Sequence, residues 1–222
     1  MYAILDVDAW RGQGVVVDAP GVLESIAGAL LDGGAATLQV RAKRAPASAT
    51  VAMLQRLLPL ARAAGVPLVA NDRLDLAQLA GVDALHVGQD DLPLADVRRL
   101  APALAVGVST HDRRQLGVAL AARPTYVAFG PVFDTASKHA PDPTVGPERL
   151  AEAATLARSA QTPLVAIGGV TLERVPTLVA AGVRWAATIG ALIAVDAGGA
   201  PDLSTIVQRT RALDAALRGA AG

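Results

Sequence analysis

The chain alternates between short apolar runs and segments with helical spacing, and the alternation repeats eight times. The apolar runs span residues 2–7, 35–40, 67–70, 84–87, 103–108, 125–129, 163–167 and 184–189. The segments with helical spacing span 20–31, 46–64, 74–80, 93–101, 111–122, 146–160, 171–181 and 202–217. Continuously apolar runs are typical of parallel strands that are covered on both faces. The pattern predicts an α/β fold, and eight units favour a (β/α)8 TIM barrel over an open doubly wound sheet.

The joints between these segments repeat a short phrase. Ala64-Gly65-Val66, Ala80-Gly81-Val82 and Ala181-Gly182-Val183 each end a helical segment and begin an apolar run. Glycine suits these places because it adopts the left-handed conformation needed just past a helix end. No change of composition divides the chain, so we expect one barrel domain over residues 1–222. The longest loop, 130–145, is rich in proline and charge, and we expect it to serve the site.

Composition narrows the classes of function. The 20 basic and 20 acidic residues balance, and aromatic residues make up 3% of the chain, so we expect no nucleic-acid partner. No apolar run approaches the roughly 18 residues of a membrane span. Asp6 and Asp8 in the apolar part of the N-terminal segment argue against a secretory signal. The absence of cysteine excludes thiolate catalysis. We therefore expect a cytoplasmic enzyme acting on small molecules, and the sequence leaves a homo-oligomer open.

Residues that can carry chemistry follow the strands. The carboxyl ends of barrel strands form the active site of such folds. Those positions hold Gln39, Arg41 and Lys43, then Asn71 and Asp72, then Gln89, Asp90 and Asp91, then Ser109, Thr110 and His111, then Thr135, Ser137 and Lys138, then Gly168 and Gly169, and finally Ile189 and Gly190. This one-sided set of cations, carboxylates, hydroxyls and glycines predicts a site for phosphorylated ligands.

Two phosphate locations are expected within that set. Asp72 and Asp91 follow neighbouring strands and suit a Mg2+ ion that also binds phosphate oxygens. The cations Arg41, Lys43 and Lys138 can neutralise a polyanion. Gly168-Gly169, ahead of a helix that begins near Thr171, offers backbone N–H groups to a second phosphate. One location would depend on the metal and the other would not.

Structural alternatives remain open for several of these residues. Asp72 could cap the helix that begins at Leu74, and Asp91 could cap the helix that begins at Pro93. Spacing does not decide between Asp90 and Asp91. His86 lies within an apolar run and is interpreted as a core histidine whose ring nitrogens are bonded.

The residues at these strand ends resemble those of a known family, the thiamine-phosphate synthases. The matching phrases are Gln39-x-Arg41-x-Lys43, Asn71-Asp72-Arg73, His86-Val87-Gly88-Gln89-Asp90-Asp91-Leu92, Gly107-Val108-Ser109-Thr110-His111, Gly130-Pro131-Val132-Phe133-x-Thr135-x-Ser137-Lys138 and Ala166-Ile167-Gly168-Gly169-Val170. They occur in family order across residues 39–190. Together they are specific to this superfamily, although each alone is a modest signal.

The resemblance implies a (β/α)8 barrel that joins hydroxymethylpyrimidine diphosphate to hydroxyethylthiazole phosphate, releasing diphosphate. It implies Mg2+ held by Asp72 and Asp91, and a direct part in the reaction for Lys138, Ser109 and Arg41. By the same analogy, the diphosphate is held by Arg41, Lys43, Asn71 and Lys138, and the pyrimidine lies near Gln39 and Ser109. The thiazole phosphate meets Thr135, Ser137, Gly168, Gly169 and the backbone at Ile189-Gly190.

The chain departs from the family pattern at two places. Gly190 stands where the family usually has serine, so a hydroxyl contact is lost and the backbone N–H remains. The first strand ends in Ile4-Leu5-Asp6 rather than in Thr-Asp. A sister group, the thiazole tautomerases, uses a histidine near the position of His111 and tends to lack the second metal carboxylate. That activity and a non-catalytic phosphate-binding barrel are the alternatives.

Overall fold

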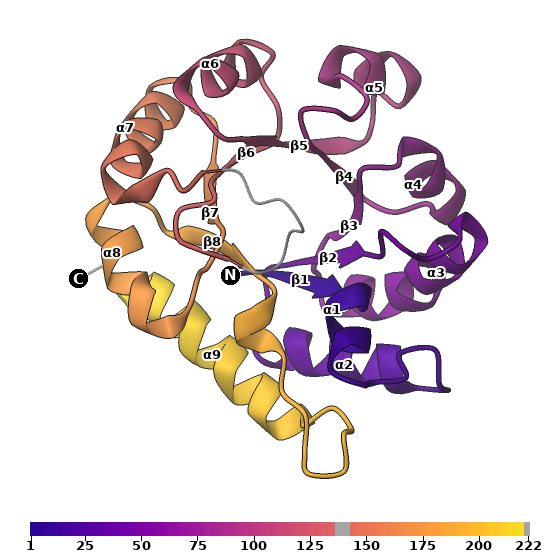
Figure 1. Cartoon of the computed structure of the whole chain (residues 1–222). Coiled ribbons are helices and arrows are strands. Elements are labelled where there is room, and N and C mark those ends of the chain that lie inside the picture. The colour runs from indigo at the N-terminus through magenta and orange to yellow at the C-terminus, as the bar shows by residue number, and fades with distance from the viewer. Residues whose placement is uncertain (136–142, 220–222) are drawn as a thin grey trace.

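Eight parallel strands close into a barrel in the computed structural model, which describes residues 1–135 and 143–219 (Figure 1). The strands are β1 (Tyr2–Asp6), β2 (Thr37–Arg41), β3 (Leu68–Asn71), β4 (Ala84–Val87), β5 (Ala105–Thr110), β6 (Tyr126–Phe129), β7 (Leu164–Ile167) and β8 (Trp185–Thr188). Each strand pairs with its sequence neighbours, and β1 also pairs with β8. The predicted TIM barrel is therefore confirmed, and the open-sheet alternative is wrong.

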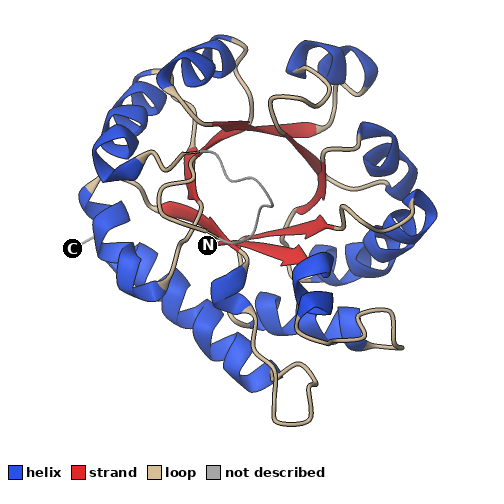
Figure 2. Cartoon of the chain, in the orientation of Figure 1, coloured by secondary structure: helices blue, strands red, loops and turns tan. Residues whose placement is uncertain are grey.

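Helices form the outer layer around this barrel (Figure 2). Over the described residues they are α1 (Val7–Gly12), α2 (Val22–Asp32), α3 (Ala47–Ala63), α4 (Leu74–Ala80), α5 (Leu94–Leu100), α6 (Arg113–Ala121), α7 (Gly146–Ser159), α8 (Val175–Ala180) and α9 (Leu203–Gly219), with 3-10 turns η1 (Leu172–Arg174) and η2 (Gly190–Leu192). Each segment expected to be helical overlaps one of these helices. Within the described residues, no helix is long and apolar enough to cross a membrane.

The short helix α1 was not predicted from the sequence. The carboxylate of Asp6 accepts a hydrogen bond of 2.9 Å from the backbone N–H of Ala9 and so caps this helix. A helix of six residues is too short for its apolar spacing to be distinguished from that of the preceding strand. As a result, the chain turns directly from β1 into a helix, and Asp6 stays at the strand end.

Two apolar clusters lie on the two sides of the sheet. The larger cluster fills the space between strands and helices and includes Leu5, Leu38 and Leu85. The smaller cluster fills the barrel interior and contains Tyr2, Ile4, Val69, Ala84, Ala128, Val165 and Ala187. Because successive strand residues face opposite sides, the inward positions continue from Tyr2 and Ile4 to Asp6, and from Gln39 to Arg41. The interior is thus apolar near the amino ends of the strands and polar toward their carboxyl ends.

Candidate active site

The predicted site residues of the first five strands meet along one edge of the barrel. Asp6 is in register with Arg41, and Asn71 is in register with His86. Ser109 lies near the end of β5, one residue before the last residue of that strand. The loops that follow these strand ends carry the remaining predicted residues.

Asp72 and Asp91 come together at this edge. Lys43 Nζ lies 3.1 Å from Asp72 Oδ2, and Asp91 Oδ2 accepts a 2.7 Å hydrogen bond from the backbone N–H of Gly88. Burial raises the pKa of Asp91 above its ordinary value, the Gly88 N–H opposes that rise, and the charge of Asp72 adds to it. The two carboxylates are therefore close enough for their repulsion to raise the pKa of Asp91.

The backbone at Asp72 is unusual. Its φ is +63°, in the left-handed region that non-glycine residues enter rarely. Such a conformation costs on the order of 1–3 kcal/mol and tends to occur at functional sites. The neighbouring chain stabilises it, because the N–H of Asp72 donates to the carbonyl of His86 at 2.8 Å. The conformation directs the carboxylate toward Lys43 rather than along the following helix.

The helix-capping alternatives for both carboxylates are wrong. The residue that caps α4 is Arg73, and the residue that caps α5 is Pro93, each without a side-chain capping bond. The structure also distinguishes Asp90 from Asp91, because Asp90 is exposed whereas Asp91 is partly buried. Asp91 is thus the carboxylate that accompanies Asp72.

The donor set at this edge fits a hard divalent cation. Mg2+ is usually held in proteins by one or two carboxylates and completes its shell with water and phosphate oxygens. Asp72 and Asp91 supply two carboxylates that repel one another, and a divalent cation would remove that repulsion. The described residues contain no cluster of three or more His, Cys, Asp or Glu side chains. A cation bound here would therefore depend on ligand oxygens as well as on the protein.

The predicted cations have different surroundings. Arg41 forms an ion pair with Asp6, a carboxylate that is only 2% exposed. Lys43 is half exposed and faces Asp72. Lys138 and Ser137 lie outside the described residues. Because Asp6 holds one end of its guanidinium, the orientation of Arg41 is restricted.

Gln39 and Ser109 meet through a buried polar chain. Gln39 Nε2 donates to the Tyr2 hydroxyl at 2.6 Å, and Ser109 Oγ lies 2.8 Å from His86 Nε2. His86 Nδ1 lies 2.9 Å from the hydroxyl of Tyr126. The interpretation of His86 as a bonded core histidine agrees with these contacts. The two tyrosines were not predicted, although strand alternation places Tyr2 on the same inward face as Asp6.

The second predicted phosphate location lies where the loops after β6 and β7 pack together. The N–H of Phe133 donates to the carbonyl of Gly168 at 3.1 Å. Gly168 and Gly169 have φ values of +94° and +63°, so both positions favour glycine. The Arg174 guanidinium donates to the carbonyl of Gly169 at 2.7 Å and lies 4.8 Å from the Phe133 ring centroid.

The helix after β7 differs from the expectation. Thr171 precedes the three-residue 3-10 turn η1, and the six-residue helix α8 follows it. The positive helix end is therefore weaker than one long helix would supply. Ile189 directly precedes η2, which begins at Gly190. Thr135 is half-buried.

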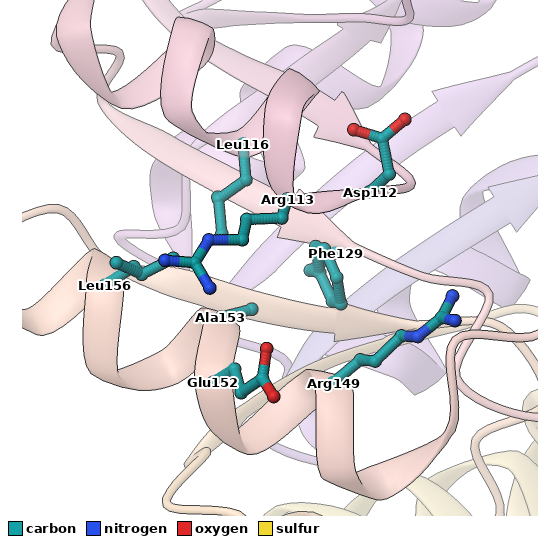
Figure 3. Close-up of a pocket in the computed structure, with 8 residues that line it drawn as sticks. All are labelled: Asp112, Arg113, Leu116, Phe129, Arg149, Glu152, Ala153 and Leu156. Carbon is teal, nitrogen blue, oxygen red and sulfur yellow. The ribbon is translucent and has the colours of Figure 1, made fainter.

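A separate hollow lies outside the barrel, between α6 and α7 (Figure 3). Its volume is about 310 Å3, and its lining residues are Asp112, Arg113, Leu116, Phe129, Arg149, Glu152, Ala153 and Leu156. None of the predicted site residues belongs to it. Asp112 is occupied in capping α6, where it accepts from the N–H of Gln115 at 2.7 Å. The hollow is therefore distinct from the strand-end site.

Comparisons with known proteins identify the family. A family model described as thiamine monophosphate synthase matches residues 15–192. The thiamine-phosphate synthase of Roseiflexus sp. (strain RS-1) is 43% identical over 199 residues, which cover 89% of this chain and 80% of the relative. That of Anaeromyxobacter dehalogenans is 42% identical over 195 residues, which cover 87% and 84%.

A comparison with solved structures finds a member of the same family. The thiamine phosphate pyrophosphorylase from Pyrococcus furiosus superposes with a TM-score of 0.80 at 26% identity, over 100% of this chain and 96% of that one. The phosphoribosyl anthranilate isomerase of Thermotoga maritima, at a TM-score of 0.61 and 14% identity, shares the fold alone. The matched sequence and the matched architecture both extend over most of the chain. The chain therefore belongs to the thiamine-phosphate synthase family.

Proposed function

We propose that this protein is a thiamine-phosphate synthase, a transferase that joins 4-amino-2-methyl-5-hydroxymethylpyrimidine diphosphate to 4-methyl-5-(2-hydroxyethyl)thiazole phosphate. The products are thiamine phosphate and diphosphate. The observation that carries the proposal is the pairing of Asp72 with Asp91 beside Lys43, at the strand ends of a barrel of this family. Paired carboxylates with a neighbouring ammonium suit a diphosphate that arrives with a divalent cation.

The reaction requires the departure of diphosphate from the pyrimidine methylene. The carbon–oxygen bond breaks and its electron pair leaves with the diphosphate, while the ring amino group stabilises the resulting cation. The lone pair of the thiazole nitrogen then forms the new carbon–nitrogen bond. The protein supplies neither a nucleophile nor a strong base in this scheme. It supplies charge at the leaving group, alignment of the two rings and exclusion of water.

The residues at and after the ends of β2, β3 and β4 would act on the leaving group. Asp72 and Asp91 would hold Mg2+, which when bound neutralises charge on the departing diphosphate. Arg41, oriented by Asp6, and Lys43 would contact the same diphosphate oxygens. Asn71 ends β3 beside them and would donate its amide N–H. We propose the same leaving-group role for Lys138.

The remaining residues would position the two rings. Gln39 and Ser109 would contact the pyrimidine from β2 and β5, with Ser109 next to the reacting centre. Thr135, Ser137, Gly168, Gly169 and the backbone at Ile189-Gly190 would hold the thiazole phosphate. The hydrogen bond from the backbone N–H of Phe133 to the Gly168 carbonyl supports this second location, because it joins the backbones of the two loops.

Product analysis tests the proposed function. The protein is incubated with both substrates and Mg2+, and thiamine phosphate is identified by mass spectrometry. We expect product only when both substrates are present. Binding of the thiazole phosphate without any product would instead identify a non-catalytic barrel.

A second assay separates the synthase from a thiazole tautomerase. The phosphorylated thiazole carboxylate is supplied alone, and its isomerisation is followed. We expect none, and we expect His111→Asn to retain condensation, since asparagine keeps an N–H donor for the Gly130 carbonyl that His111 contacts at 2.5 Å. A tautomerase using His111 as an acid–base group would lose about a hundredfold or more in rate.

A further inference from the structure

Asp8 lies beside the leaving-group residues, and none of the roles proposed above uses it. It belongs to the first turn of α1, the helix that follows β1 directly and contacts β2 (Figure 1). Its side chain is only 12% exposed. Among the described residues, Asp8 Oδ1 is the one buried side-chain atom without a hydrogen-bond partner. Burying such an oxygen costs free energy, so the contacts that hold the carboxylate in this position need an explanation.

The side-chain contacts of Asp8 lead to Arg44, in the loop between β2 and α3. Asp8 Oδ2 accepts a 3.1 Å hydrogen bond from the backbone N–H of Arg44. Asp8 Oδ1 lies 3.3 Å from Arg44 Nε, which is an ion-pair distance without the geometry of a hydrogen bond. The Arg44 side chain is 67% exposed, so solvent screens the ion pair. The backbone bond is therefore the contact that fixes the main chain of this loop.

Lys43 directly precedes Arg44 and depends on the course of that main chain. The loop turns at this point, since the backbone N–H of Ala45 donates to the carbonyl of Ala42 at 3.3 Å. On its other side, Lys43 Nζ lies 3.1 Å from Asp72 Oδ2. The Lys43 side chain is long, flexible and 53% exposed. A fixed backbone at Arg44 therefore limits the positions that the ammonium group of Lys43 can reach.

Two acidic residues after the start of β1 thus contact two basic residues of β2 and its loop. Asp6 is in register with Arg41 and pairs with it, and Asp8 contacts Arg44 further along the chain. Helix α1 makes the second contact feasible, because its cap at Asp6 turns the chain at once and keeps Asp8 near β2. The first pair orients one leaving-group cation, and the second pair holds the loop that carries Lys43.

We propose that Asp8 is a positioning residue of the diphosphate site, and that it holds the main chain at Arg44 so that Lys43 is directed toward Asp72. Asp8 itself does not contact the ligand, because its negative charge would repel a diphosphate. The inference deepens the proposed function and rests on it for the identity of the anion. Two competing accounts are that Arg44 binds the anion itself, and that Asp8 only stabilises the fold.

Binding of inorganic diphosphate with Mg2+, measured by calorimetry on the full chain, is the first test. Asp8→Ala and Asp8→Asn remove the same charge, but only asparagine keeps an acceptor for the Arg44 N–H. We expect Asp8→Asn to bind diphosphate about tenfold more tightly than Asp8→Ala. Equal affinities would overturn the proposal.

A further variant tests the role of the Arg44 side chain. Arg44→Ala keeps its backbone N–H and loses only the exposed ion pair, so we expect diphosphate binding to weaken by no more than about threefold at physiological ionic strength. A loss of tenfold or more would identify Arg44 as a ligand contact and would contradict the assigned role of Asp8.

A double-mutant cycle with Lys43 separates positioning from stabilisation. Asp8→Ala and Asp8→Asn are each combined with Lys43→Ala, and diphosphate binding is measured again. We expect the two double variants to agree within about twofold, because no lysine is left for the backbone to direct. A tenfold difference that persists without Lys43 would show that Asp8 acts on the fold as a whole, which would refute the proposal.

Hydrogen exchange of the Arg44 amide, followed by nuclear magnetic resonance, tests the loop without ligand. We expect this amide to exchange about tenfold faster in Asp8→Ala than in wild type. The matched control is Asp18→Ala, which removes a 2.5 Å ion pair with Arg11 of the same helix and should leave the Arg44 amide unchanged. Unchanged exchange in Asp8→Ala would also overturn the proposal. A wild type with the expected exchange and diphosphate binding but no condensing activity would refute the proposed function and leave this inference standing.

Discussion

Asp91 occupies a position in which an ionised carboxylate is disfavoured. Burial and the neighbouring Asp72 raise its pKa from the ordinary value of 3.8, and the Gly88 N–H and the charge of Lys43 oppose that rise. The folded protein thus holds this proton more tightly than the unfolded chain does. Stability therefore falls as the pH rises from about 3.8 through the raised pKa, and the loss is complete above it. At neutral pH, a bound divalent cation would offset this repulsion.

This reasoning predicts the behaviour of Asp91→Asn. The amide keeps an oxygen for the Gly88 N–H and removes the charge, so we expect a higher melting temperature than wild type at pH 7 without Mg2+. We also expect Mg2+ to raise the melting temperature of wild type but not of Asp91→Asn. Asp90→Asn is the matched control, because Asp90 is exposed, and it should behave as wild type. A lower melting temperature for Asp91→Asn would contradict the account of repulsion.

Gly190 gives a second prediction at the scale of one residue. A Cβ at Gly190 meets nothing within 4 Å, and the position shows no left-handed φ. Gly190→Ser should therefore fold normally and add a hydroxyl beside the thiazole phosphate. We expect the KM for that substrate to fall severalfold, by the roughly 1 kcal/mol of one hydrogen bond. The contrasting variant is Gly168→Ala, whose Cβ would overlap Pro131 at φ +94° and should destabilise the protein. An unchanged KM in Gly190→Ser would place the phosphate elsewhere.

At the scale of elements, the loops after β6 and β7 behave as one unit. Arg174 joins them by bonding to the Gly169 carbonyl and covering the Phe133 ring. We expect Arg174→Met, which keeps the aliphatic stem, to raise the KM for the thiazole phosphate while changing the KM for the pyrimidine diphosphate little. Steady-state kinetics with each substrate varied in turn measures this. Equal changes in both KM values would argue that Arg174 stabilises the whole barrel rather than this loop pair.

The elements were predictable to different degrees. All eight strands could be read from continuous apolar runs, because strands covered on both faces leave that signal. Helix α1 could not, since it is six residues long and depends on a single capping bond from Asp6. The helix expected over 171–181 is instead a 3-10 turn followed by a short helix. Spacing alone does not distinguish these, because both have apolar residues about every third or fourth position.

At the scale of the whole molecule, barrel closure creates contacts that sequence order does not reveal. The placement of Asp72, Asp91 and Ser109 at one edge could be predicted, since all parallel strands end on the same side. The chain from Tyr2 to Tyr126 and His86 could not, because it joins strands across the interior. The left-handed backbone at Asp72 could not be predicted from the sequence either, because no local residue pattern required it. Recognition of the family supplied roles that geometry alone would have left open.

The central claim is that a Mg2+ ion held by the Asp72–Asp91 pair assists diphosphate departure. The most direct measurement is the initial rate of diphosphate release with both substrates, over a range of Mg2+ concentrations, for wild type, Asp91→Asn and Asp90→Asn. We predict release that requires Mg2+ and both substrates, a loss of about a hundredfold or more in Asp91→Asn, and normal release in Asp90→Asn. Release in wild type without a divalent cation, or an undiminished rate in Asp91→Asn, would contradict the account.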